Sequence, residues 1–140
     1  MGNALLVLAM IALGGGLGGV ARFWLSGVIA RRFGETFPWG TLVVNVTGAA
    51  AIGVLAALLL EPGAEAPAVR HLPAWYGLAI GVLGSYTTVS SFSLQTLALA
   101  RAGETGRALA NVGLSLGLCL LAAGGAWAAT LRLVAAWGGA

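Results

Sequence analysis

The sequence predicts an all-α membrane protein with four transmembrane helices in a single membrane domain, residues 1–140. Hydrophobic residues make up 59% of the chain and charged residues only 8%, whereas about a quarter of the residues of a soluble domain are charged. The apolar residues fall into four runs, and each is long enough for the roughly 20 residues that span a bilayer. We expect these spans over residues of about 4–30, 40–60, 73–100 and 107–132.

The charged residues exclude several functional classes. All seven basic residues are Arg and all four acidic residues are Glu, so the lysine of a phosphate-binding P-loop and the aspartate of a Ser-His-Asp triad are absent. His71 is the only histidine and Cys119 the only cysteine, which rules out a His-rich zinc site and an intrachain disulfide. We therefore expect no enzyme. In a membrane protein the net charge of +3 reflects arginines near the span ends, not nucleic-acid binding.

The first span is rich in glycine. Gly14, Gly16 and Gly19 match the dinucleotide-binding pattern G-x-G-x-x-G, but no strand precedes them, so we reject that interpretation. The pairs Gly14/Gly18 and Gly15/Gly19 have the four-residue spacing that lets helices approach closely in lipid. Tight helix packing is the better interpretation of this run.

Arg22 follows 18 uncharged residues and lies about 14 Å from Arg31 along a continuous helix. A central arginine in a span costs about 2.5–3.5 kcal/mol on insertion scales. Two interpretations stay open: a side chain that reaches the membrane surface, or a fixed positive charge at the mouth of an anion path.

The second span follows the loop Phe37-Pro38-Trp39-Gly40, with Trp39 as an interfacial anchor, and contains Thr41 and Asn45. An amide at membrane depth either joins helices or lines a polar path. The sequence does not choose between these two roles for Asn45. Residues 61–72, with two prolines and His71, form the one conspicuous loop.

The third span holds the most polar stretch of the chain. Residues 72–100 carry no charge, yet six Ser and Thr residues lie between positions 85 and 93. As one straight helix these 29 residues extend about 43 Å, against a hydrocarbon core of about 30 Å. We expect a break at Gly81 and Gly84, followed by the clustered Ser and Thr residues, and interpret the polar run as a pore wall. The alternative is that each hydroxyl bonds back to its own helix.

The fourth span places Asn111, Ser115 and Cys119 on one helical face, because they recur every four residues. Such a stripe suits a narrow wet path but is also typical of small packing residues. Arginines are nearly balanced between the two sides, with four on one and two on the other. The chain can therefore insert in both orientations.

Three motifs resemble the Fluc/CrcB fluoride channels. They are Gly-Gly-Val-Ala-Arg22, Trp39-Gly-Thr-Leu-Val-Val-Asn45 and Gly84-x-x-Thr87-Thr88-Val89-Ser90-Ser91-Phe92-Ser93, in the same order and at similar spacing. The resemblance implies an antiparallel dual-topology homodimer in the cell (inner or plasma) membrane, with two pores that passively export cytoplasmic fluoride. It also implies a structural sodium ion at the dimer centre.

By position, the family's pore residues map to Asn45, Phe92 and Ser115, with Thr41, Thr88, Val89 and Ser91 nearby and Arg22 at the mouth. The sodium ligands map to the backbone carbonyls of Gly84 and Thr87. Four positions depart from the family pattern: Val89 replaces a phenylalanine, Gln95 an acidic residue, Asn111 a tyrosine and Cys119 a serine. The departures bear on conduction, not on the fold.

Two other classes compete with the channel. A small dual-topology proton-coupled drug exporter needs a carboxylate inside a span, but Glu35, Glu61, Glu65 and Glu104 all lie outside the expected spans. A subunit that only packs against others would have its polar run sealed by other helices.

Overall fold

The computed structural model describes residues 2–60 and 72–138. Its elements are α1 (Gly2–Phe33), α2 (Trp39–Leu59), α3 (Leu72–Ala74), η1 (Trp75–Leu83), α4 (Gly84–Tyr86), α5 (Val89–Arg101) and α6 (Thr105–Gly138). Four stretches are long and apolar enough to cross a membrane: Ala4–Phe33, Trp39–Leu59, Trp75–Arg101 and Thr105–Trp137. The prediction of an all-helical chain with four apolar spans is confirmed. The fourth runs past its expected end at residue 132, and the predicted loop lies outside the described residues apart from Leu72.

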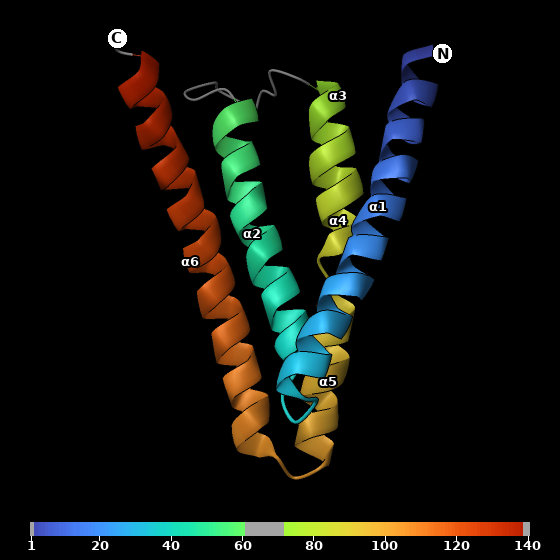
Figure 1. Cartoon of the computed structure of the whole chain (residues 1–140), viewed down its shortest axis with the longest axis vertical. Helices are drawn as coiled ribbons and strands as arrows, with labels where there is room; N and C mark the ends of the chain where they lie inside the picture. The colour runs from blue at the N-terminus through green and yellow to red at the C-terminus, as the bar shows by residue number, and fades with distance from the viewer. Residues whose placement is uncertain (1, 61–71, 139–140) are drawn as a thin grey trace.

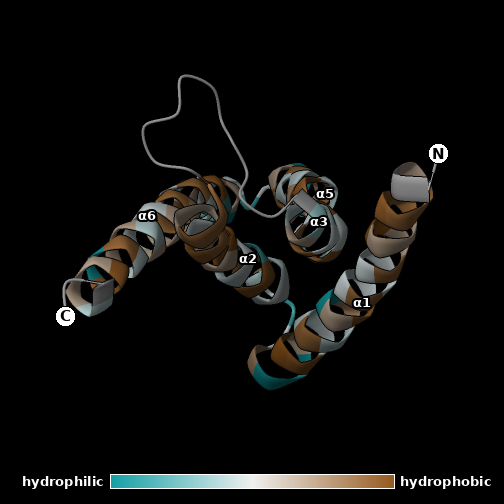
Figure 2. Cartoon of the chain, turned by 90° about the horizontal axis from the view of Figure 1, so that it is seen from above, coloured by the Kyte–Doolittle hydropathy of each residue, from teal (hydrophilic) through white to brown (hydrophobic). Residues whose placement is uncertain are grey.

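The helices stand side by side with α1 and α6 outermost and α2 and the third span between them (Figures 1 and 2). They converge near the α1–α2 and α5–α6 connections and spread apart towards the two termini (Figure 1). Few apolar side chains are buried, Val44 and Leu42 among them, while many leucines and tryptophans on α1 and α6 are exposed. In a membrane protein such a surface faces lipid or another subunit.

Glycines bring α1 against η1 as the sequence predicts. A Cβ atom on Gly14 would lie 2.5 Å from the carbonyl oxygen of Gly77, and one on Gly18 would collide with the carbonyl of Val82. From the other side, a Cβ on Gly81 would lie 3.1 Å from the Ile11 carbonyl. The Gly14/Gly18 pair thus forms the close contact, whereas Gly19 faces open space.

The third span is not one uniform α-helix. It begins with the wide π-helical turns of η1, which the sequence did not predict, and continues through the single turn α4. Helical geometry persists through Gly81 and Gly84, where we expected a break, and stops at Thr87 (ψ 157°) and Thr88 (φ −151°, ψ 115°), both extended. The span bends slightly there before α5 begins.

Two glycines end helices at the convergent side of the bundle. Gly34 (φ 77°) follows α1, and Gly103 (φ 78°) follows α5. The amides of Gly103 and Glu104 donate to the carbonyls of Ala100 and Leu99, which is the Schellman motif that satisfies helix-end carbonyls. These turns fix how α2 and α6 return across the bundle.

Candidate functional site

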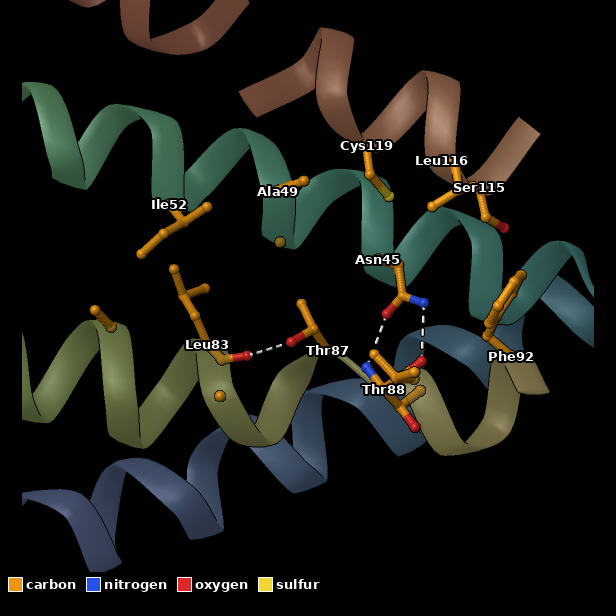
Figure 3. Close-up of a pocket in the computed structure, with 14 residues that line it drawn as sticks. Asn45, Ala49, Ile52, Leu83, Thr87, Thr88, Phe92, Ser115, Leu116 and Cys119 are labelled. Atoms are coloured by element: carbon orange, nitrogen blue, oxygen red, sulfur yellow. Dashed lines mark hydrogen bonds between the residues drawn. The ribbon is translucent and has the colours of Figure 1, made fainter. Parts of the chain in front are cut away.

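Asn45 on α2 holds the extended segment between α4 and α5. Its Nδ2 donates to the Thr88 carbonyl at 2.9 Å, and its Oδ1 accepts from the Thr88 N–H at 2.8 Å (Figure 3). The amide thus replaces the helical acceptor of the Thr88 N–H and gives a further donor to the carbonyl of this N-cap residue, at a depth where unpaired backbone groups cost several kcal/mol each. Of the two roles left open for Asn45, helix joining is therefore observed, and the side chain also lines a cavity.

The hydrogen bonds around Thr88 change the partners of two backbone carbonyl groups, those of Gly84 and Thr87. In a continuous helix the Thr88 N–H would donate to Gly84 and the Ser91 N–H to Thr87. Here the Thr88 N–H donates to Asn45, and the Ser91 N–H donates to the Thr88 hydroxyl at 3.1 Å. The carbonyls of Gly84 and Thr87 consequently lose their regular helical donors, and these are the two residues that the family resemblance implies as cation ligands.

Thr88 also organises the start of α5. Its hydroxyl is the N-cap acceptor of Ser91 and lies 3.1 Å from the hydroxyls of both Ser90 and Ser91. Only 7% of Thr88 is exposed. The predicted polar run is therefore in part a hydrogen-bonded cap, which local capping chemistry explains.

A cavity of about 430 Å³, here called the phenylalanine cavity, opens between α2, the third span and α6 (Figure 3). It brings together seven of the predicted site residues: Asn45, Gly84, Thr87, Thr88, Val89, Phe92 and Ser115. Apolar side chains such as Ile52, Leu83 and Leu116 complete the wall. Val89 is 76% exposed within the single chain.

A second cavity of about 290 Å³, the arginine cavity, contains the remaining predicted residues. Arg22, Thr41 and Ser91 line it together with Ser26, Ser90 and Thr88, among others. Thr41 is 8% exposed and Arg22 is half-buried. Thr88 lines both cavities, so it marks the place where they adjoin.

A third cavity of about 630 Å³, the mouth cavity, lies beside the α1–α2 connection. It shares Thr41, Ser91 and Ser26 with the arginine cavity and adds Glu35 and Gln95. The Gln95 Oε1 is buried and has no hydrogen-bond partner in the described part of the chain. The three cavities therefore adjoin through shared lining residues, from the mouth cavity to the phenylalanine cavity.

The predicted stripe on α6 faces α5. Asn111, 2% exposed, donates to the Thr96 hydroxyl at 2.8 Å, and Thr96 donates to the Phe92 carbonyl at 2.7 Å. The Ser115 hydroxyl lies 3.5 Å from the Asn111 Oδ1, which is a long and weak hydrogen bond. Ser115 and Cys119 line the phenylalanine cavity, whereas Asn111 is not among its lining residues.

Comparison with known proteins decides the family. The family model described as CrcB-like protein, Camphor Resistance (CrcB), matches residues 9–129. The chain belongs to the CrcB family. The relative named Fluoride-specific ion channel FluC 2 from Bradyrhizobium diazoefficiens is 53% identical over 125 residues, which cover 87% of this chain and 89% of the relative.

Two further CrcB relatives are similarly close. Fluoride-specific ion channel FluC 2 from Rhodopseudomonas palustris is 58% identical over 116 residues, covering 82% of this chain and 86% of its own. Fluoride-specific ion channel FluC from Opitutus terrae is 56% identical over 114 residues, covering 80% and 83%. With its four apolar helices, this CrcB protein is a multi-pass protein of the cell membrane.

Three polar residues around the site were not predicted from the sequence: Thr47, Tyr86 and Thr96. Thr96 follows Phe92 by one helical turn, which was a usable signal for its bond to the Phe92 carbonyl. Thr47 and Tyr86 are 39 residues apart, and their hydroxyl oxygens lie 2.7 Å from each other. No local pattern predicts that contact, because it depends on how α2 packs against α4.

Proposed function

We propose that this protein is a fluoride-selective passive channel that lets fluoride leave the cytoplasm. The names of its relatives support this function. The observation that carries it is a set of three cavities that share lining residues, with hydroxyl and guanidinium groups in one and the Asn45 amide and the Phe92 ring in the next. Nothing in this arrangement requires a nucleotide or a covalent step.

The arginine cavity supplies the chemistry that replaces water around a small anion. Fluoride holds its hydration shell tightly, so a selective path must offer closely spaced donors. Hydroxyls of Thr41, Ser90 and Ser91 can each donate one proton, and Arg22 supplies a permanent positive charge. Of the two interpretations of Arg22, its place in this cavity supports the charge at the mouth of an anion path.

Asn45 and Phe92 line the next part of the proposed anion path, in the phenylalanine cavity. The Asn45 amide has two N–H groups, and only one is occupied by the Thr88 carbonyl, so the second is available to fluoride. The edge of the Phe92 ring is electropositive and offers C–H groups in an apolar surrounding. Ser115 follows, and its weak bond to Asn111 is easily exchanged for an anion.

Two antiparallel copies form the conducting unit in this proposal, with one pore along each. The large exposed apolar surface of the single chain supports assembly, and the balanced arginines permit both orientations. Each subunit then closes the open side of its partner's phenylalanine cavity, where Val89 and Phe92 lie.

Sodium at the centre of the dimer fits the donors that are present. Hard cations prefer oxygen ligands, and the Gly84 and Thr87 carbonyls have lost their helical donors at the interruption of the third span. Two carbonyls from each of two copies would hold the ion. A buried cation supplies positive potential to a nearby anion path and joins the two subunits.

The direction of transport follows from simple chemistry. Undissociated HF crosses membranes and releases fluoride in the less acidic cytoplasm, where the anion is trapped. The inside-negative membrane potential drives an anion outward, by about 2.3 kcal/mol per 100 mV. A passive channel therefore suffices. A proton-coupled exporter would need a carboxylate inside a span, and the described spans of this chain contain none.

Fluoride efflux from liposomes tests the function. Purified protein is reconstituted in vesicles loaded with potassium fluoride or potassium chloride, and release is started with a potassium ionophore. We expect rapid release of fluoride and retention of chloride. Equal release of both anions, or of neither, would contradict a fluoride-selective channel.

A further inference from the structure

A second contact besides Asn45 ties the interrupted third span to α2. The Tyr86 hydroxyl lies 2.7 Å from the Thr47 hydroxyl. Thr47 also donates towards the carbonyls of Val43 and Val44, at 2.8 and 3.1 Å. A threonine hydroxyl has a single proton, so Thr47 is the acceptor in its contact with Tyr86, and Tyr86 is the donor.

The packing around this hydrogen bond leaves little freedom. A Cβ atom on Gly48 would collide with the Thr87 methyl group and would lie 3.2 Å from the Tyr86 ring. One turn of α2 therefore contacts three successive residues of the third span, with Thr47 against Tyr86, Gly48 against Thr87 and Asn45 against Thr88. On the α4 side, the Thr87 N–H and hydroxyl both donate to the Leu83 carbonyl, at 3.0 and 2.9 Å.

Tyr86 lies between the two residues whose carbonyls lose their helical donors. Asn45 fixes the chain after Gly84 and Thr87, whereas Tyr86 fixes it between them. Ligand groups must be held within about half an ångström to bind an ion well. We propose that Tyr86 and Thr47 are positioning residues that orient the Gly84 and Thr87 carbonyls for the cation, an inference that rests on the sodium site of the proposed function.

The Tyr86 and Thr47 hydroxyls should contribute unequally to the binding of sodium. Tyr86→Phe keeps the ring against Gly48 and leaves Thr47 with its proton still donated to α2. Thr47→Val removes this acceptor and also the hydroxyl bonds to the Val43 and Val44 carbonyls, so it is the larger loss. Once Tyr86 is Phe, Thr47→Val should add less than it does alone. The pair therefore predicts a non-additive double-mutant cycle.

The test measures how the thermal unfolding and the fluoride efflux of the intact protein depend on sodium concentration. Wild type and variants are purified in a buffer with a bulky organic cation, sodium chloride is titrated, and both thermal unfolding and fluoride efflux are recorded. We expect the sodium concentration for half-maximal effect to rise about two- to tenfold in Tyr86→Phe and by more in Thr47→Val, the range that the loss of one hydrogen bond corresponds to. The double variant should not exceed Thr47→Val, and efflux at saturating sodium should stay near wild type.

Matched controls come from the same chain. Thr47→Ser keeps the acceptor and should retain the wild-type sodium midpoint. Tyr76→Phe removes a hydroxyl at the start of the third span, and Thr130→Val removes one that donates at 2.8 Å to the Ala126 carbonyl on α6. Both should leave the midpoint unchanged, even if they lower the unfolding temperature.

The outcomes separate the proposals. A lower unfolding temperature with an unchanged sodium midpoint in both Tyr86→Phe and Thr47→Val would overturn the positioning role and leave the channel intact. A wild type that conducts fluoride without any response to sodium would overturn the sodium site and the positioning role together. A wild type that does not conduct fluoride would instead contradict the proposed function.

Discussion

The arginine cavity and the phenylalanine cavity adjoin at Thr88 but differ in chemistry. The first is lined mainly by serine and threonine residues and one guanidinium, with Phe23 and Val44, while the second is lined mainly by apolar side chains, with few polar groups such as Asn45 and Ser115. Hydroxyls compensate an anion for lost water, whereas an apolar wall excludes water. In the proposed channel, the difference assigns dehydration to the first cavity and selective passage to the second, divided at Thr88, which Asn45 holds.

Asn45→Asp should have the largest effect, because it acts on both cavities. A carboxylate cannot donate to the Thr88 carbonyl, and its negative charge repels the anion. A charge at membrane depth costs about 2.5–3.5 kcal/mol, so we expect fluoride efflux to fall at least about a hundredfold. Efflux is measured alongside gel filtration, and near-normal flux from a normally assembled protein would remove Asn45 from the path.

Phe92→Ile tests the phenylalanine cavity alone. The substitution keeps apolar volume but removes the electropositive ring edge, an interaction of about 0.5–1.5 kcal/mol in aromatic pairs. Fluoride efflux should decrease by up to about tenfold. Phe33→Ile, at the exposed end of α1, is the control and should conduct normally. Equal rates for the two variants would refute a role for the Phe92 ring.

Val89→Phe tests the phenylalanine cavity by the opposite change, because it adds an aromatic ring instead of removing one. Val89 is exposed beside Phe92 in the single chain and lines the same cavity, so a second ring there adds C–H donors to the apolar step. We expect efflux to rise by a few-fold, within the range of one aromatic contact. A decrease would indicate that the ring obstructs the path in this protein.

Glu35→Gln should have the smallest effect, since it acts on the mouth cavity alone. The exposed Glu35 carboxylate lines this cavity, so its negative charge should oppose anion entry in the proposed channel. Screening limits such an effect at physiological salt, so we expect efflux to rise less than about twofold and the gain to vanish in concentrated salt. Glu104→Gln, on the α5–α6 connection, is the matched control. A salt-independent change would contradict this electrostatic origin.

The sequence predicted much of this architecture from local signals. The four apolar runs mark the spans, the Gly14/Gly18 spacing marks the close contact of α1, and the polar run marks the site. The partner of Asn45 was not predictable, because Thr88 lies 43 residues away and only tertiary packing brings it near. The same holds for Thr47 and Tyr86. The π-helical turns of η1, which pack against α1, are signalled by no residue pattern of the span.

The position of the interruption illustrates this limit. Glycine favoured a break at Gly81 and Gly84, yet both residues remain helical. Gly81 instead lets the third span pack closely against α1. The chain departs from helical geometry where the Asn45 side chain on α2 replaces the helical acceptor of the Thr88 N–H and the Thr88 hydroxyl accepts from the Ser91 N–H. Glycine lowers helix propensity, but the competing hydrogen bonds decide where the helix stops.

The reversal potential in a planar bilayer tests the central claim most directly. The protein is placed between a concentrated and a dilute fluoride solution with equal chloride on both sides, and the voltage at zero current is recorded with and without a pH gradient. A passive fluoride channel predicts a reversal at the fluoride equilibrium potential that does not move with pH. A reversal near zero, or one that follows the proton gradient, would contradict this account.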